Sequence, residues 1–194
     1  MMELAGRVLV GMVLVAMGIA GPTTSYAQKF QVDNSHSSLV FAVNHFGLSY
    51  TYGRFNQIHG SFELVNGELT NQGFTFTIDT ESVDTNQEER DSHLRGPDFF
   101  NVQQFPEIKF QTTGLQKTGD QYLVTGDMQI LDQIRPVKFT VSRVGVGKGP
   151  FGELRAGYFT KFSIKRSEFG MDKMIGSIGD EVSITFSFEG LSEK

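Results

Sequence analysis

The sequence predicts an all-β fold, an antiparallel sandwich or barrel of about eight strands with one short helix inserted between strands. Apolar and polar residues alternate over most of the chain after residue 28, as they do in strands with one buried face. Turn signals separate these stretches at the spacing typical of antiparallel sheets. Helix signals gather in one place, between Ser82 and Phe110, and no repeat or low-complexity segment marks a second domain.

Residues 1–27 have the features of a secretory signal peptide. Arg7 precedes an apolar run of 14 residues, Val8–Gly21, and small residues lead up to Ala27. We predict cleavage between Ala27 and Gln28, because the apolar run is too short to span a bilayer comfortably. An uncleaved N-terminal anchor is the alternative.

Removing 27 of the 194 residues leaves 167, enough for a single domain, residues 28–194, with its own core. The formal net charge of −5 and the absence of clustered lysine and arginine argue against a nucleic-acid partner. The sequence has no cysteine, so the fold must be held without disulfides. It has 18 phenylalanines and no tryptophan, which favours either a dense core or the wall of an apolar cavity.

The first strands are expected soon after the predicted cleavage site. A short extended segment, Phe30–Asp33, leads into a strand at Ser38–Phe46 that is apolar on both faces. Tyr50–Leu64 is predicted to be one long or bent strand, because its apolar positions change parity near Gln57 as they do at a β-bulge. Asn66-Gly67 is a strong signal for the hairpin turn that follows.

The remaining strands alternate and are joined by short turns. Phe74–Ile78 has one apolar face and one polar face. Beyond the helix, hairpins are predicted at Thr118–Asp120 and at Asp132–Gln133. A glycine-rich bend, Gly145–Gly152, then precedes the last two strands. A barrel of about eight strands is either filled by its own side chains or just wide enough for one small ligand, and periodicity alone does not choose between these states.

A short helix is predicted at about residues 86–95 from the signals at its two ends. Thr85 and Glu88 have the spacing of a capping box, in which the two side chains satisfy backbone N–H groups of the first turn. Gly96 suits the left-handed residue that ends many helices, and Pro97 stops propagation. Both ends of the helix are therefore specified locally.

This predicted helix lacks an apolar stripe. Leu94 is the only hydrophobic residue between Asn86 and Arg95, so the helix cannot be a core element. We expect it to lie over the sheet as a lid or corner piece, held by Leu94 and the aromatic pair Phe99-Phe100.

Motifs along nearly the whole predicted domain resemble the YceI-like family. They occur in the family's order and are Asn34-Ser35-His36-Ser37, Val43-Asn44-His45-Phe46-Gly47, Gly53-Arg54-Phe55, Ser82-Val83-Asp84-Thr85, Arg90-Asp91-Ser92-His93-Leu94-Arg95, Asp98-Phe99-Phe100, Phe105-Pro106, Val124-Thr125-Gly126-Asp127, Arg135-Pro136-Val137 and Arg166-Ser167-Glu168-Phe169-Gly170. The resemblance implies an exported bacterial protein of the periplasm, with a lipocalin-like antiparallel β-barrel that holds a polyisoprenoid chain, such as a quinone tail or a related amphiphilic lipid. Phe30, Phe151 and Asp132 depart from the usual pattern of the family.

Alternation and the resemblance together predict which inward side chains contact the lipid. These predicted wall residues are Phe41, Val43, Phe55, Phe74, Phe76, Ile78, Phe110, Val124, Met128, Phe139, Phe162, Ile184 and Phe186. An isoprenoid lipid is the expected partner, and no cofactor beyond this ligand is expected. Once the leader is removed we expect no stable membrane insertion, although transient membrane contact is compatible with such a ligand. The sequence leaves the oligomeric state open, including a homodimer.

The densest polar cluster of the sequence comprises Asp84, Arg90, Asp91, His93, Arg95 and Asp98. In one interpretation Arg90, Asp91, His93 and Arg95 hold a lipid head group at the barrel mouth or form part of a lid. In the other, the cluster pins the helix to the strand ends through caps and through the i,i+4 pairs Glu89–His93 and Asp91–Arg95. The sequence favours the second interpretation, because caps and helical pairs already account for several members.

Two catalytic or metal-dependent alternatives have weaker support. The four histidines, His36, His45, His59 and His93, lack the close spacing of metal ligands, so no metal site is expected. A lipid-modifying hydrolase would need a nucleophile and base. Ser35 beside His36 is sequence adjacency rather than a triad, and the sequence has no G-x-S-x-G motif. We therefore do not expect an enzyme.

A packed barrel that acts only through protein partners of the cell envelope stays open as a further alternative. The loop Gly170–Asp180 contains two methionines and two isoleucines among its glycines. Methionine adapts to varied apolar partners, so this loop is expected to be either a portal flap or a docking surface.

Overall fold

The computed structural model describes residues 26–193. The predicted leader therefore lies almost entirely outside the described residues, and its cleavage between Ala27 and Gln28 stays a prediction. Ala27 is the first residue of a strand and pairs with Val65.

Within residues 26–193 the chain forms eleven β-strands, one α-helix and three 3-10 helices. The strands are β1 (Ala27–Val32), β2 (Ser38–His45), β3 (Ser49–Phe55), β4 (Ile58–Val65), β5 (Glu68–Asp79), β6 (Val83–Asp84), β7 (Glu107–Thr118), β8 (Gln121–Ile130), β9 (Gln133–Lys148), β10 (Leu154–Lys165) and β11 (Ile178–Ser192). The helices are η1 (Asn34–His36), η2 (Thr80–Ser82), α1 (Glu88–Arg95) and η3 (Arg166–Phe169).

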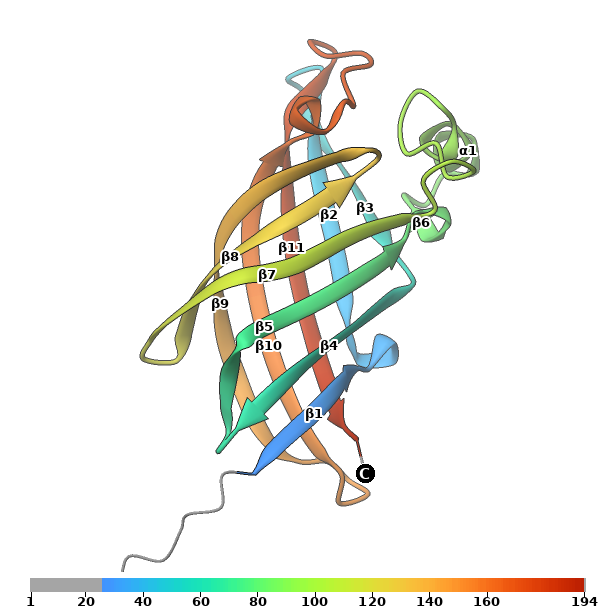
Figure 1. Ribbon diagram of the computed structural model, residues 1–194. Coiled ribbons are helices and arrows are strands. Elements are labelled where there is room, and N and C mark those ends of the chain that lie inside the picture. Colours follow the sequence, from blue (N-terminus) through green and yellow to red (C-terminus); the bar gives the residue numbers. More distant parts are fainter. Residues whose placement is uncertain (1–25, 194) are drawn as a thin grey trace, which may run out of the picture.

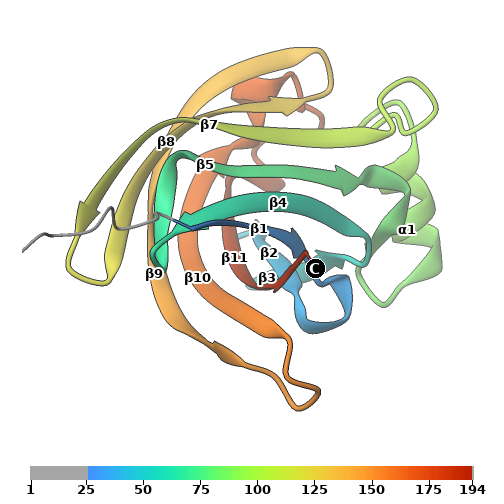
Figure 2. The ribbon, with the colours of Figure 1, turned by 60° about the horizontal axis from the view of Figure 1, so that its bottom comes forward.

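These strands form a closed antiparallel barrel of eight strands (Figures 1 and 2). The order β1-β4-β5-β7-β8-β9-β10-β11 is closed by pairing of β11 with β1. Towards the upper end in Figure 1, β2 takes the place of β1 beside β11, β3 pairs with β2, and β6 pairs with β3. Three of the eight barrel strands therefore consist of two segments each, and the prediction of an antiparallel barrel of about eight strands is confirmed.

One predicted strand is corrected by this arrangement. Tyr50–Leu64 is interrupted at Asn56 and Gln57, and its halves pair with different strands, β3 with β2 and β4 with β1 and β5. The change of parity near Gln57 is therefore a break in the ladder rather than a bulge. It belongs to a set of breaks that cross three neighbouring strands.

The three breaks lie side by side and form a kink seam, defined here as Asn34, Asn56, Gln57 and Ser82. The Asn34 amide donates to the carbonyl of Asn56 at 3.0 Å and accepts from the backbone N–H of Ile58 at 2.7 Å. The Ser82 hydroxyl accepts from the N–H groups of Asn56 at 3.1 Å and Gln57 at 3.0 Å. Side chains thus bond backbone groups where the strands change direction (Figure 1), in addition to the backbone bonds from Asn56 to Ser82 and from Asp79 to Gln57.

The kink seam decides where α1 lies. Above it, β6 pairs with β3 over only two residues and is the outermost strand of the sheet order. The chain then leaves the barrel wall for residues 85–106, which contain α1, and returns as β7 beside β5. In Figure 1 α1 stands beside the barrel next to β6. The expected corner piece therefore lies at an opening in the wall.

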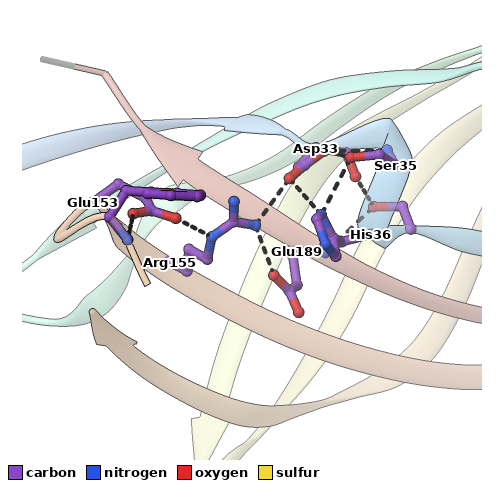
Figure 3. A network of polar contacts seen from close by, with 8 residues as sticks. Asp33, Ser35, His36, Glu153, Arg155 and Glu189 are labelled. Carbon is purple, nitrogen blue, oxygen red and sulfur yellow. Dashed lines mark hydrogen bonds and ion pairs between the residues drawn. The ribbon is translucent and has the colours of Figure 1, made fainter. Parts of the chain in front are cut away.

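A charge network holds the first break against the neighbouring strands β11 and β10 (Figure 3). Arg155 of β10 donates to Asp33 at 2.9 Å, to Glu189 of β11 at 3.0 Å and to Glu153 at 2.8 Å. Hydrogen bonds from Ser35 and Arg155 hold the pKa of the Asp33 carboxyl well below its usual range. The turn between β1 and β2 is thereby fixed to the adjoining strands β11 and β10 of the barrel wall.

The lower end of the barrel is filled by aromatic rings. Phe30 stacks on Phe62 with centroids 5.0 Å apart, and Tyr158 meets Phe62 edge-on at 5.3 Å. Phe74 and Phe188 pack edge-on at 5.3 Å above them. All five residues are buried, so this end has a packed aromatic floor. Both β1, at its start, and β11, at its end, reach this lower end of the molecule (Figure 1).

The predicted helix is confirmed and ends at Arg95, before Pro97, but the roles predicted for Thr85 and Gly96 are wrong. The N-cap of α1 is Gln87, whose side chain accepts from the backbone N–H of Arg90, and not Thr85. Thr85 does not cap the helix, because its N–H and hydroxyl both donate to the carboxylate of Asp91. Gly96 has φ −73° and is extended, so the helix ends without the expected left-handed residue.

Replacing Asn34 with alanine is expected to lower the free energy of unfolding by about 2 kcal/mol, because two backbone groups lose their side-chain partner. Urea unfolding followed by circular dichroism measures this change. Asn71→Ala, at an exposed position of β5, is the matched control and should change stability by less than about 0.5 kcal/mol. Equal effects of the two substitutions would show that the kink seam does not depend on Asn34.

Candidate ligand-binding cavity

The upper half of the barrel encloses a cavity of about 650 Å³. Its deep end is lined by the buried rings of Phe74 and Phe188, which belong to the aromatic floor. Its other end is lined by residues of the α1 segment and of the loop between η3 and β11, including the exposed Gln87 and Met174. The cavity therefore opens between these two segments, at the mouth of the barrel.

Most of the predicted wall residues face this cavity. Twelve of the thirteen line it, namely Phe41, Val43, Phe55, Phe74, Phe76, Ile78, Phe110, Met128, Phe139, Phe162, Ile184 and Phe186. Val124 is fully buried within the packed core and does not line the cavity. Contact of these side chains with a ligand stays a prediction.

The sequence also missed lining residues, of two kinds. Leu39, Ile108, Ile130 and Val141 lie on strands and share the parity of predicted wall residues, so alternation could have found them. A second kind comes from the mouth segments and includes Leu94, Phe99, Phe100, Met171, Met174 and Ile178, most of which no strand period could have predicted. Phe100 packs edge-on against Phe55 with centroids 5.3 Å apart, so α1 is anchored to the cavity wall as expected.

Glycines beneath three phenylalanine rings keep the barrel hollow. A Cβ atom built on Gly53, Gly60 or Gly126 would lie under 3.0 Å from a ring, against Phe41, Phe76 and Phe110 respectively. Gly53 and Gly60 are the direct cross-strand partners of the rings that cover them. The rings can therefore lie flat on the wall instead of projecting into the lumen, which leaves space inside a barrel rich in phenylalanine.

Two of the four candidate head-group residues line the cavity. Arg90 does so while donating to the hydroxyl and the carbonyl of Thr85, both at 2.7 Å. His93 also lines it, and its Nε2 lies 3.3 Å from a carboxylate oxygen of Asp98. That contact lowers the pKa of the Asp98 carboxyl. The mouth thus offers an arginine and a histidine that are already oriented by neighbouring groups.

The other two candidates have structural contacts. Asp91 is buried and accepts from Thr85, whereas Arg95 donates to the backbone carbonyls of Glu81 at 3.0 Å and Val83 at 3.1 Å. The predicted i,i+4 pairs of α1 are therefore wrong, because Asp91 and Arg95 turn towards the strand ends and His93 turns to Asp98. The interpretation that part of the cluster pins the helix to the wall agrees with these contacts.

Arg166 begins one of the motifs that carry the family resemblance, but the sequence predicted no role for it at the mouth. It is buried, and it ties the loop between η3 and β11 by donating to the carbonyls of Met171 at 2.7 Å, Gly179 at 2.8 Å, Lys173 at 2.9 Å and Ile178 at 3.1 Å. Burial lowers the pKa of its guanidinium. One side chain thus shapes the loop that forms the second side of the mouth.

Ser35 and His36 lie outside the cavity lining, in the network of Figure 3. The Ser35 hydroxyl donates to Asp33, and His36 Nδ1 lies 2.8 Å from the other oxygen of the same carboxylate. A nucleophile and base need the serine on one imidazole nitrogen and the acid on the other. Here Ser35 and Asp33 both contact Nδ1, so the arrangement is not that of a triad.

Within residues 26–193, no three His, Cys, Asp or Glu side chains lie close enough to hold a metal ion. In the same part of the chain, no helix has the length and apolar character needed to cross a membrane.

The YceI-like domain family matches residues 30–190 of this chain. A UPF0312 protein of Pectobacterium atrosepticum is 33% identical over 189 residues, which cover 97% of this chain and 98% of the relative. Among solved structures, the chain is similar to Burkholderia cenocepacia BcnA with a TM-score of 0.73 and 22% identity, over 81% of this chain and 98% of that one. A polyisoprenoid binding domain from Saccharophagus degradans gives a TM-score of 0.64 with 14% identity, over 84% and 98% of the two chains.

Gly126→Ala is expected to lower the free energy of unfolding by about 1–3 kcal/mol, because its methyl group displaces the ring of Phe110. Adding Phe110→Leu should recover part of this loss, which a double-mutant cycle in urea measures. Gly145→Ala is the control, since a Cβ there meets nothing within 4 Å. Equal losses of unfolding free energy for the two substitutions would contradict the claim that the Phe110 ring needs a glycine at position 126.

Asp91→Ala is expected to destabilise the protein by about 2 kcal/mol, because the buried donors of Thr85 lose their acceptor. Ser92→Ala, at the next and exposed position of α1, should have little effect on the midpoint of thermal unfolding. Unchanged stability of the Asp91 variant would remove the argument that this carboxylate pins the α1 segment.

Proposed function

The chain belongs to the YceI-like family, and from this premise we propose that it binds an isoprenoid lipid, a polyisoprenoid or an isoprenoid-quinone-like amphiphile, inside the barrel. The observation that carries the proposal is the apolar cavity of about 650 Å³, closed by an aromatic floor and open at one end. A long apolar chain fits such a space, because it can enter through the mouth with its tail towards the floor.

The binding energy would come from the apolar wall. Burying on the order of 600 Å² of apolar lipid surface yields roughly 15 kcal/mol before ordering costs of several kcal/mol are subtracted. An exposed ion pair at the mouth contributes at most about 1 kcal/mol. We therefore assign Arg90 and His93, which line the mouth, to orienting a polar head group rather than to affinity.

The similar domain from Saccharophagus degradans is described as polyisoprenoid binding, which supports the same ligand class here. The leader pattern of residues 1–27 supports a place of action in the periplasm. Sequestration or transport of the lipid is a binding role and requires no catalytic step. A hollow barrel also favours this role over a packed barrel that works only through protein partners.

The experiment is organic extraction and mass spectrometry of protein purified from its own envelope. We expect an isoprenoid in near-equal molar amount with the protein. Consistently empty protein, purified without detergent, would contradict the proposal.

Ile184→Trp tests whether the lipid occupies the cavity, since Ile184 lines it. We expect about ten-fold less extracted lipid, because the larger ring takes up space that the tail needs. Ser187→Trp is the matched control on the same strand, at an exposed position, and should leave the lipid content unchanged. Thermal unfolding checks that both variants are folded; equal lipid content in two folded variants would place the ligand elsewhere.

A further inference from the structure

The mouth of the barrel carries exposed apolar side chains on two loops. Phe46 and Leu48 lie in the turn between β2 and β3, where the side chain of Leu48 is 87% exposed. Met174 and Ile175 lie in the loop between η3 and β11, where Ile175 is 47% exposed. Leaving such side chains in water is unfavourable, and these four residues are called the mouth rim below.

The two loops of the mouth rim are held together. The backbone N–H of Phe46 donates to the carbonyl of Ser177 at 2.7 Å, and His45 pairs with Ile178. Phe46 and Met174 both adopt left-handed backbone conformations, with φ 52° and 60°. Non-glycine residues seldom adopt these angles, and they persist only where surrounding contacts hold them. The apolar side chains are therefore presented by a fixed edge; both loops lie at the upper end of Figure 1.

The mouth rim is continuous with the cavity. Met174 is exposed on the rim and also lines the cavity. His45, next to Phe46 in the chain, is likewise exposed and lines the cavity. An apolar molecule leaving the cavity therefore meets apolar side chains at the edge of the mouth. This continuity gives the rim a place in the entry and exit of a ligand.

Two exposed tyrosines lie on β3 below the mouth rim. Tyr50 and Tyr52 are exposed on one face of β3, two and four residues beyond Leu48. At roughly 3.4 Å per residue they lie about 7 and 14 Å further from the tip. Tyrosine favours the head-group level of a bilayer, because its ring is apolar and its hydroxyl is polar. An apolar tip followed by tyrosines fits a lipid surface better than it fits a protein partner.

The charges near the rim do not form an attractive patch for anionic lipids. Asp172 precedes Lys173, and the Lys173 ammonium lies 3.6 Å from Asp98. The two signs are mixed, so attraction to a charged surface would be weak and screened by salt. Insertion of apolar side chains then contributes most of the free energy of binding to the bilayer.

We propose that the mouth rim inserts into the surface of a lipid bilayer, so that the cavity opens towards the acyl chains without contact with bulk water. The purpose of this docking rests on the proposed function, whereas the docking itself requires only the rim. Partition to a zwitterionic bilayer should therefore occur with ligand-free protein and should be insensitive to salt.

The test is flotation of purified, delipidated protein with phosphatidylcholine vesicles. We expect wild-type protein to float with the vesicles. The double variant Leu48→Glu and Ile175→Glu should have a partition coefficient at least about ten-fold lower, because two inserted apolar groups become charged. The matched control is Val144→Glu and Phe151→Glu, which are 72% and 94% exposed on the β9–β10 hairpin away from the mouth. This control should float like the wild type, with or without added salt.

Three results would overturn the inference: no flotation of the wild type, an equal loss in the control variant, or flotation that requires anionic lipid and disappears in salt. A rim that instead retained one envelope protein from solution, without floating, would also overturn it in favour of a protein partner. Extraction of lipid from wild-type protein tests the proposed function independently. Protein that contains lipid but never floats would support the carrier role and contradict the docking. Protein that floats but contains no lipid would support the docking and contradict the carrier role.

Discussion

The barrel depends on the hydrogen bonds that let three adjacent strands change direction at one level. A closed barrel has no free edge, and every buried backbone N–H and C=O within it needs a partner. Asn34 supplies the partner of the buried Ile58, and Asn34 and Ser82 also bond the exposed backbone of Asn56 and Gln57 where the ladder is interrupted. Below the kink seam the wall is closed and filled by rings. Above it the wall ends at β6, and the α1 segment occupies the opening. The mouth is therefore a consequence of the seam.

The hollow upper half requires a second condition, since 18 phenylalanines could easily fill the interior. The rings that cover Gly53, Gly60 and Gly126 lie along the wall and do not fill the interior. The same residue type thus packs the floor, where Phe62 stacks on Phe30 and covers Gly190, and bounds the cavity, where Phe41, Phe76 and Phe110 cover glycines. Position on the strands, and not composition, separates the filled half from the open half.

The period of two residues carried most of what the sequence could predict. It gave the antiparallel strands and placed twelve of thirteen proposed wall residues on the cavity, because alternation fixes the face of every residue in a regular strand. It failed at Gln57, where a break and a bulge change parity alike. The capping signal at Thr85 failed because Asp91, six residues later, competes for the same hydroxyl. Arg166 has only backbone carbonyls as partners in its loop, and no sequence pattern marks such contacts.

Both ends of the described chain reach the floor of the barrel, opposite the mouth (Figure 1). An anchor retained before β1 would hold the floor towards its membrane and turn the opening into the surrounding space. Release of the leader would instead leave the molecule free to reorient. For experiments the same polarity is useful, because attachment of the protein to a sensor surface or a fusion partner through either end presents the opening to solution.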